Sequence, residues 1–451
     1  MTRSASFRPV THSASLRGLA HSASLRGTVE AALALEDGSV FVGQAFGAEA
    51  DVAAEVVFNT GITGYQEVVT DPSYRGQMVV MTHPQIGNYG VADSADESVR
   101  PWVSALIVRE LAEQPHHWQS RARLEDFLKA WDVPGLQGID TRALVRRLRD
   151  SGTQRGVLQH SGPSGFDRRQ LDDLKEMARN APSVSQLDLV TGVSDVLPKA
   201  KSEDEIALLD CGAKWNIVRS LERRGIHPRI YPWNTTAAEI LETRPKGILL
   251  SNGPGDPAQL PTIVAELQAL VRSGTPMMGI CLGHQLLGLA AGATTSRLPY
   301  GHHGGNHPVR ELATGRVTIT TQNHEFQVVA ETLPASSGFE VSRINLNDGS
   351  VEGLRHRELP VFSVQYHPEG CPGPQDSQSL FDEFLAMAGI PARSLTSPVV
   401  RSSPSPVEGR SLSEDSRDSG ERGPGEDCGD SAEHGTGEDC ADSAEHGDSG
   451  G

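Results

Sequence analysis

The 451-residue sequence predicts an α/β protein, in which an N-terminal mixed α+β domain precedes a domain with an open, mostly parallel sheet flanked by helices. Between residues 205 and 292, short apolar runs alternate with helical patterns, which is typical of a parallel sheet. In the first part of the chain, apolar runs are broken by Asp-Gly and Gly turns, which favour strands and hairpins. Both ends of the chain lack the apolar content of a core.

Composition excludes several classes of protein. The hydrophobic fraction of 37% suffices for two ordinary cores, but not for a chain packed from end to end. No run approaches the roughly 18 apolar residues of a membrane span, so we expect no membrane insertion. Five cysteines exclude a disulfide scaffold and favour a reducing compartment, here the cytoplasm. The net charge of −18 argues against nucleic-acid binding over the whole chain.

The first 27 residues are predicted to be a disordered extension. They carry arginines but no acid, and they repeat HSASLRG at 12–18 and 21–27. This Arg- and Ser-rich composition also fits an organellar transit peptide. The perfect duplication favours the simpler interpretation, an extension or a start codon placed too far upstream.

Residues 393–451 are predicted to be a disordered acidic tail, since they are rich in Ser, Pro, Gly, Asp and Glu. GEDCGDSAEHG (425–435) recurs as GEDCADSAEHG (437–447). The repeat could bind a soft metal, but its spacing is weak and a solvated tail is favoured. We therefore expect no metal site in the chain. The potential ligands of the repeat are Cys428, His434, Cys440 and His446.

The first domain is expected over residues 28–190. AALALEDGSVFVGQAFG indicates two strands and a hairpin, and EVVFNTGITGYQEVVTDPSY (55–74) continues the strand-and-turn pattern. MVVMTHP (78–84) is a strand stopped by proline. Helical spacing follows in RLEDFLKAWDV (123–133), in TRALVRRLRDSG (141–152) and in RRQLDDLKEMARN.

The second domain is expected over residues 204–392, where strands and helices alternate. In such sheets ligands bind at the carboxyl ends of the strands, and both SNGPGDP and GICLGHQ fall there. The strand-containing segments are EIALLDCG (205–212), PRIYPW (228–233), KGILLSNGPGDP (246–257) and PMMGICLGHQLLGLAAG (276–292). The helical segments between them are NIVRSLERRG (216–225), AAEILETR (237–244) and TIVAELQALVRSG (262–274).

The turn Gly279-Ile280-Cys281-Leu282-Gly283 is the thiol form of a nucleophile elbow. Its glycines, two before and two after the cysteine, leave room for a sharp strand-to-helix turn. The partial positive charge at the helix N-terminus is expected to favour the thiolate. The N–H of Leu282 has no intrahelical partner and can donate to an oxyanion. The alternative is a buried structural cysteine.

A base for this thiol is predicted in SVQYHPEG (363–370), where a strand ends at His367-Pro368-Glu369. A nucleophilic cysteine needs a base, and a carboxylate can orient that base. A surface His-Pro turn is the alternative, but the elbow 86 residues earlier favours catalysis. The loop SNGPGDP lacks the Lys-Ser/Thr of a P-loop, and it could approach a small substrate and offer a second oxyanion donor. Taken alone, the loop favours the alternative, an ordinary Gly/Pro turn after a strand.

GICLGHQ, the downstream HPE and the upstream SNGPGDP together resemble the class I glutamine amidotransferases. The resemblance implies a triad of Cys281 as nucleophile, His367 as general base and acid, and Glu369 as its orienting group. It also implies that a thioester forms, that the glutamine amide is hydrolysed, and that ammonia passes to a synthetase.

Further motifs resemble the small subunit of carbamoyl-phosphate synthase over about residues 30–390. They are VFNTGITGYQEVVTDPSY with HPQIGNYG, IDTRALVRRLRDSG, YGHHGGNHPV (300–309) and QNHEFQV (322–328). This resemblance implies a large-subunit partner that uses ATP, bicarbonate and Mg to make carbamoyl phosphate for arginine and pyrimidine synthesis. It implies no cofactor in this chain. The implied glutamine contacts are Ser73, Gly253, Gly255, Leu282, Gln285, Asn323 and Phe326. Ser73 belongs to the first domain, so an interdomain contact should close the pocket.

The chain departs from the family pattern at Glu325, where Gln-Asn-His-Gly-Phe is usual. A positive φ there would cost a glutamate on the order of 1 kcal/mol and could weaken glutamine binding. Cys371 could oxidise with Cys281, although a harmless substitution is favoured, and Cys211 is expected to be structural.

Two alternatives for the function stay open: a catalytically weakened regulatory subunit, and a stand-alone γ-glutamyl hydrolase. The intact triad argues against the first, and the N-terminal motifs argue against the second.

Overall fold

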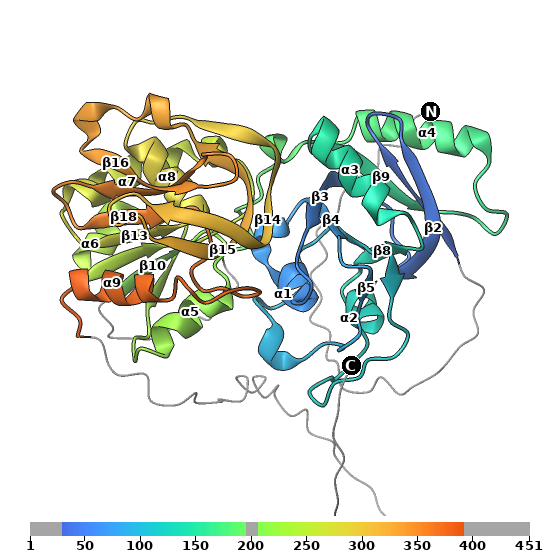
Figure 1. The fold of residues 1–451 in the computed structure, drawn as a ribbon, viewed down its shortest axis with the longest axis horizontal. Helices are drawn as coiled ribbons and strands as arrows, with labels where there is room; N and C mark the ends of the chain where they lie inside the picture. Colours follow the sequence, from blue (N-terminus) through green and yellow to red (C-terminus); the bar gives the residue numbers. More distant parts are fainter. Residues whose placement is uncertain (1–28, 195–205, 392–451) are drawn as a thin grey trace, which may run out of the picture. The chain divides into compact units, whose positions relative to one another are not determined.

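The computed structural model describes residues 29–194 and 206–391, which form a closed barrel of strands followed by a nine-stranded sheet (Figure 1). The N-terminal extension, the repeat-containing acidic tail and most of the segment between the two predicted domains lie outside these residues. Within the described ranges, no helix is long and apolar enough to cross a membrane.

The N-terminal part, residues 29–194, is built on a seven-stranded barrel in the order β1-β2-β8-β6-β4-β3-β9. The predicted hairpin of β1 and β2 is confirmed. Closure depends on β9, which pairs antiparallel with both β1 and β3. The barrel strands are β1 (Glu30–Leu35), β2 (Val40–Gly47), β3 (Val52–Asn59), β4 (Gln77–Met81), β6 (Ala105–Ile107), β8 (Pro134–Gln137) and β9 (Gln154–His160), and β5 (Gln85–Ile86) pairs with β7 (Glu110–Leu111) outside it.

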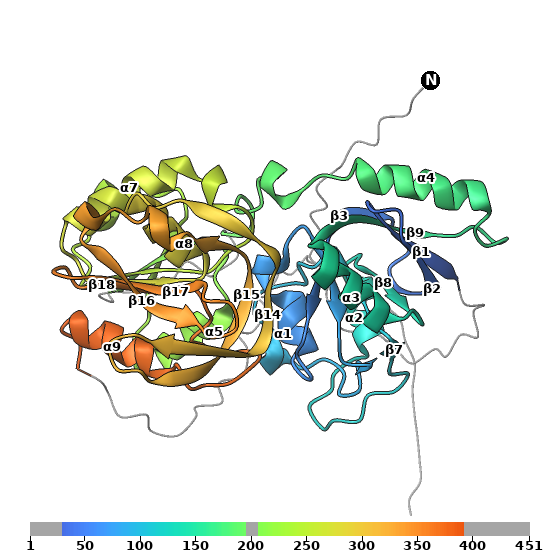
Figure 2. The same cartoon turned by 45° about the horizontal axis from the view of Figure 1, so that its top comes forward.

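Helices cover this barrel because successive apolar side chains of its strands point to opposite faces, and helices pack against them. Ala32 and Ala34 of β1 pack against the helix α4, whereas Leu33 and Leu35 belong to the cluster that includes α3 (Figure 2). The predicted helices are confirmed as α2 (Leu124–Ala130), α3 (Thr141–Ser151) and α4 (Arg168–Arg179).

One prediction in this part was wrong. Tyr65–Thr70 forms the helix α1, where the sequence predicted a continued strand-and-turn pattern. The helix follows Gly64 in the left-handed region, and the hydroxyl of Tyr65 donates to the carbonyl of Gly90 at 2.7 Å. Such tertiary contacts outweigh the local preference of its adjacent valines for strand.

The C-terminal part, residues 206–391, contains the open sheet in the order β11-β10-β12-β13-β18-β17-β16-β14-β15. The first five strands in this order are parallel, and the remaining pairings are antiparallel. The predicted open sheet is thus confirmed, and its parallel part runs from β11 to β18. Its strands are β10 (Ile206–Asp210), β11 (Arg229–Pro232), β12 (Gly247–Leu250), β13 (Met277–Ile280), β14 (Thr295–Glu311), β15 (Val317–Val328), β16 (Phe339–Asn345), β17 (Val351–His356) and β18 (Val361–Val364).

Both faces of this sheet are apolar and covered by helices (Figure 1). Leu209 and Leu250 pack in the cluster with α6, α7 and α8, while Leu208 and Leu249 pack with α5 and α9. The pairing of β13 with β18 lies at the centre of the sheet, so their carboxyl ends are adjacent. The helices are α5 (Trp215–Glu222), α6 (Ala237–Glu242), α7 (Pro261–Arg272), α8 (Leu282–Ala290) and α9 (Ser379–Met387).

Candidate active site

Cys281 lies between β13 and α8 in a strained conformation, with φ 52° and ψ −105°. A Cβ on Gly279 would lie 2.8 Å from the carbonyl oxygen of Gly283, and a Cβ on Gly283 would lie 2.6 Å from that of Leu250. The two glycines therefore permit a turn that larger residues would block. The thiol is buried, and it donates to the carbonyl oxygen of Asn323 at 3.5 Å.

Two backbone N–H groups near the thiol are available to an anion. The first is that of Leu282, at the start of α8, and the second is that of Gly253, in the loop after β12. Neither has an acceptor among the residues that the structure describes. Unpaired amides at a helix start are the usual donors to a developing oxyanion.

His367 and Glu369 follow β18 and form a buried pair. The Nδ1 of His367 lies 2.7 Å from the Oε1 of Glu369. Burial would lower the pKa of His367, but Glu369 raises it to about 10. The Nε2 atom is buried and makes no conventional hydrogen bond to the described residues, although interaction with the Cys281 thiol also favours the protonated ring. The ring can therefore exchange a proton at Nε2 while Glu369 holds Nδ1.

Sequence reasoning missed Lys214, which is fully buried beside this pair. Its Nζ lies 3.2 Å from the Oε1 of Glu369 and also donates to the carbonyl of Cys371. Burial would raise the pKa of Glu369, but Lys214 and His367 hold it at about 2. The one signal for Lys214 is its place shortly after β10, at the carboxyl edge of the parallel strands, where sites gather.

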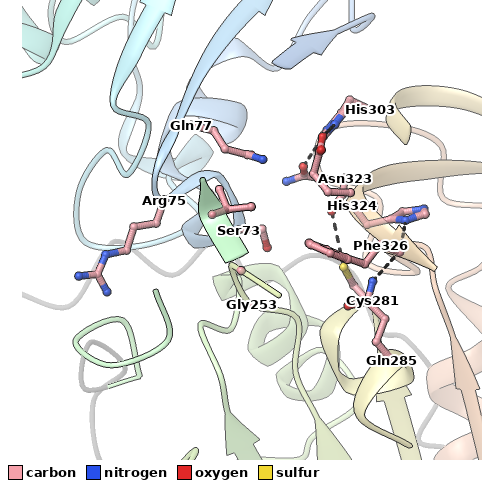
Figure 3. Close-up of a pocket in the computed structure, with 13 residues that line it drawn as sticks. Ser73, Arg75, Gln77, Gly253, Cys281, Gln285, His303, Asn323, His324 and Phe326 are labelled. Atoms are coloured by element: carbon pink, nitrogen blue, oxygen red, sulfur yellow. Dashed lines mark hydrogen bonds and ion pairs between the residues drawn. The ribbon is translucent and has the colours of Figure 1, made fainter. Parts of the chain in front are cut away.

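A pocket opens beside Cys281, and residues of both parts of the chain line it (Figure 3). Ser73 faces Cys281 and Asn323 from the opposite side of this pocket. Of the residues predicted from the sequence, the lining includes Ser73, Gly253, Gly255, Cys281, Gln285, Asn323 and Phe326. Leu282 does not line it, and neither do His367 and Glu369.

Direct contacts join the two parts at this pocket. The Nδ2 of Asn252 donates to the Oγ of Ser73 at 2.9 Å, and the Nδ2 of Asn323 donates to the Oδ2 of Asp71 at 2.9 Å. The interdomain contact expected from Ser73 is present. His367 instead borders a second cavity of about 280 Å³, which Asp71 and Lys214 also line.

The positive φ that would strain a glutamate at position 325 is absent. Glu325 lies within β15 and does not have a positive φ. Its buried carboxylate lies in the pocket wall, where Arg297 and His303 pair with it.

The other residues of the pocket lining that sequence reasoning missed are Arg75, Gln77, Val184, His303 and His324. Both histidines stand inside motifs that the sequence singled out, but nothing local indicates that they reach the pocket.

The described cysteines are free thiols with different surroundings. Cys211 is fully buried, and burial raises its pKa well above the usual value. Cys371 is half-buried, and burial raises its pKa to about 12, with Glu97 acting in the same direction. Both thiols therefore stay protonated near neutrality, which leaves Cys281 as the candidate nucleophile.

One buried cluster has the composition of a metal site. Donor atoms of His302, His324 and Glu352 lie within 4.8 Å of one another. However, both ring nitrogens of His324 are already hydrogen-bonded, to Phe326 and Gln322, and His302 bonds to Asp348 at 2.8 Å. These bonds explain the cluster as a polar network within the sheet.

Comparison with known families matches both parts of the chain. The model of the "Carbamoyl-phosphate synthase small chain, CPSase domain" matches residues 33–158. The model of "Glutamine amidotransferase class-I" matches residues 207–387.

Similar proteins cover most of the chain. A carbamoyl phosphate synthase small chain from Symbiobacterium thermophilum is 50% identical over 359 residues, which are 78% of this chain and 97% of the relative. Small chains from Bacillus caldolyticus and Archaeoglobus fulgidus are 46% and 45% identical. Those alignments cover 79% and 80% of this chain, and 95% and 99% of the relatives.

Proposed function

The chain belongs to the family of carbamoyl phosphate synthase small chains, and we propose that it is the subunit that hydrolyses glutamine and supplies ammonia to a separate large subunit. The observation that carries the proposal is the position of Cys281. It stands on a strained elbow at the end of β13, next to the strand whose carboxyl end bears His367 and Glu369.

The chemistry follows from these positions. His367 takes the proton of the Cys281 thiol at Nε2, and the thiolate attacks the carbon of the glutamine side-chain amide. The N–H groups of Leu282 and Gly253 bind the oxyanion that forms. His367 gives its Nε2 proton to the leaving nitrogen, so ammonia departs and a thioester remains. His367 then takes a proton from water, which attacks the thioester and releases glutamate and the thiolate.

The pocket supports glutamine as the substrate, because it is small and rich in polar groups. Asn323, Ser73 and the backbone of the Gly253–Gly255 loop can bind the polar ends of the molecule, while Phe326 packs on its methylene groups. We therefore propose Ser73, Gly253, Gly255, Leu282, Gln285, Asn323 and Phe326 as glutamine contacts, with Leu282 acting through its backbone.

We propose that the partner subunit binds ATP, bicarbonate and Mg and makes carbamoyl phosphate for arginine and pyrimidine synthesis. The chain itself needs no cofactor for the chemistry above. We also propose a cytoplasmic location, which the three free thiols of the described ranges support, since unpaired cysteines are typical of reducing compartments.

Ammonia release from glutamine tests this function, with and without a cognate large subunit, for the wild type and for Cys281→Ser. We expect Cys281→Ser to lose at least about a thousandfold in kcat, as when a nucleophile is removed. Wild-type turnover should rise when the partner, ATP and bicarbonate are present. A matched Cys211→Ser variant should keep its activity, because that thiol is protonated and lies outside the pocket lining.

Two outcomes would favour other functions. Activity that depends on Cys281 but ignores the partner would indicate a stand-alone hydrolase. A wild type without activity, alone and with the partner, would contradict the catalytic proposal and indicate a regulatory subunit.

A further inference from the structure

We propose that Glu325 is a positioning residue for glutamine: with Arg297 and Glu55 it forms a clasp between the barrel and the sheet that holds Asn323 and Phe326 in place. This inference rests on the proposed function, because its kinetic test needs glutamine turnover. The clasp, meaning Glu55, Arg297 and Glu325, takes its charges from strands β3, β14 and β15.

Glu325 uses both oxygens of its carboxylate. Its Oε2 accepts from Arg297 at 2.8 and 3.2 Å, and from the hydroxyl of Thr153 in the barrel at 3.0 Å. Its Oε1 lies 2.9 Å from the Nε2 of His303. A carboxylate that accepts two hydrogen bonds from a guanidinium is an ionised, fixed group, and this one bonds to both parts of the chain.

Arg297 links Glu325 of the sheet part to Glu55 of the barrel part. Its guanidinium bonds to Glu55 of β3 through both terminal nitrogens, one of them at 3.0 Å. Glu55 in turn accepts from the hydroxyl of Ser183 at 2.7 Å and from the N–H of Val184 at 3.1 Å. Val184 lines the pocket, so the clasp also fixes a segment of the pocket wall.

The hydrogen bonds from Glu325 lead to the Asn323 amide. Asp71 accepts from the Nδ2 of Asn323, so the Oδ1 must face His303, whose Nδ1 lies 3.1 Å away. His303 then faces oxygen acceptors at both ring nitrogens, because Glu325 stands at Nε2. The His303 ring therefore links the Glu325 carboxylate to the Asn323 side-chain amide.

Arg297 of the clasp also contacts Phe326. The Cζ of Arg297 lies 5.8 Å from the centre of the Phe326 ring, within the range of a cation–π contact. Phe326 also packs with the apolar side chains of Val184 and Leu189. The guanidinium can keep this place only while its carboxylate partners hold it.

Gly301, on the neighbouring strand, leaves the space that the Glu325 side chain and the His303 ring occupy. This residue of β14 has φ 67°, and a Cβ on it would lie 2.6 Å from the Oε1 of Glu325 and 2.5 Å from the Nε2 of His303. The space that a side chain would need at Gly301 is occupied by the ion pair. Glu325 is thus a packed component of the pocket wall rather than a tolerated surface change.

The test compares Glu325→Ala, Glu325→Gln and the exposed control Glu340→Ala in the full chain with its large subunit. We expect Glu325→Ala to raise the KM for glutamine about tenfold while kcat changes less than about twofold, because ground-state positioning is lost. Glu325→Gln should raise KM only about threefold, since its amide oxygen can still accept from Arg297 and Thr153. The control should match the wild type.

An unchanged KM in a folded Glu325→Ala variant would overturn the inference, as would a loss confined to kcat. If Glu325→Ala does not fold, Glu325→Gln decides, and a wild-type KM in that variant overturns the inference.

A second measurement separates the clasp from the proposed function. Iodoacetamide labelling of the Cys281 peptide, followed by mass spectrometry, needs no turnover. Faster labelling in Glu325→Ala than in the wild type and the control would support the clasp even if glutamine is not hydrolysed. Equal labelling rates in an inactive protein would overturn it.

Discussion

Lys214 is a charged residue in a place where charges are costly. It is fully buried, and it lies beside the carboxylate that orients the candidate base. Burial disfavours its charge, but Glu369, Glu97 and Asp71 raise its pKa above the usual value. Because Glu97 and Asp71 belong to the barrel part, one side chain links that part to the proposed triad.

Replacement of Lys214 by Met should be strongly destabilising. The methionine has a similar length but removes the buried cation that faces Glu369, Glu97 and Asp71, so we expect the free energy of unfolding to fall by about 3–5 kcal/mol. Urea denaturation of the full chain measures the change. The exposed Lys129→Met variant is the control, with an expected effect within about 0.5 kcal/mol. A Lys214→Met protein as stable as this control would show that the ion pair contributes little.

The pair of His367 and Glu369 should give stability a distinct pH dependence. The pKa of Glu369 is lowered from 4.5 to about 2, so its contribution is present above about pH 5 and is lost as the pH falls towards 2. The pKa of His367 is raised from 6.5 to about 10, so its contribution is present below 6.5 and is lost as the pH rises towards 10. The stability difference between the wild type and the double variant His367→Ala/Glu369→Ala should therefore peak between about pH 5 and 6.5.

Urea midpoints measured across the pH range check this, and Glu340→Ala serves as the exposed control. A difference between the wild type and the double variant that stays constant with pH would contradict the prediction.

Individual site residues could be predicted from the sequence where they stand in short local motifs. Cys281, His367 and Glu369 stand in short motifs, and the structure brings them to neighbouring strand ends. Lys214 and Glu325 were missed or misjudged, because their roles depend on partners far along the chain. For Glu325, Thr153 is 172 positions away.

The elbow between β13 and α8 is the element on which the candidate chemistry depends. An alanine at position 283 would favour the helix by up to about 1 kcal/mol relative to glycine. Its Cβ would, however, lie 2.6 Å from the carbonyl oxygen of Leu250 and 2.7 Å from that residue's Cβ. The neighbouring strand is buried, so it cannot yield easily.

We therefore expect Gly283→Ala to lower the free energy of unfolding by about 2–3 kcal/mol, because overpacking outweighs helix propensity. It should also reduce glutaminase activity, since the turn that presents Cys281 must shift. Gly162→Ala is the matched control, because a Cβ there meets no atom within 4 Å. A Gly283→Ala protein with wild-type stability would mean that the turn adapts freely.

Helices with regular apolar spacing could be predicted from the sequence, whereas strand pairings between distant parts of the chain could not. The helices α3 and α7 show regular apolar spacing, and the structure contains both. The helix α1 is only six residues long and gave no such spacing. Barrel closure rests on β9, which pairs with β1 across more than a hundred residues of chain. Nothing local in either strand specifies that partner.

At the scale of the whole molecule, the pocket exists only because two parts of the chain meet. Ser73 comes from the barrel part, and its hydroxyl accepts from Asn252 of the sheet part. Removal of this hydroxyl leaves a buried amide donor without its acceptor, which costs about 1–3 kcal/mol. It also removes a polar group from the pocket wall.

Ser73→Ala should raise the KM for glutamine about tenfold, which corresponds to about 1.4 kcal/mol of binding free energy. We expect a smaller effect on kcat, because Ser73 takes no part in the bond changes of the proposed mechanism. Steady-state kinetics of the full chain with its partner measures both values. The exposed Ser164→Ala is the control, and equal KM values in the two variants would show that the barrel part does not contact glutamine.

The central pairing of β13 with β18 also governs when the molecule becomes chemically competent. Met277 and Val361 are neighbours in the sheet but 84 positions apart in sequence, so their pairing must close a long loop. Contacts of such high sequence separation form slowly. During synthesis, a ribosome therefore carries the nucleophile for several seconds before it delivers the base, at about 5–20 residues per second. A nascent chain that ends within this interval carries Cys281 without His367, so we expect it not to hydrolyse glutamine.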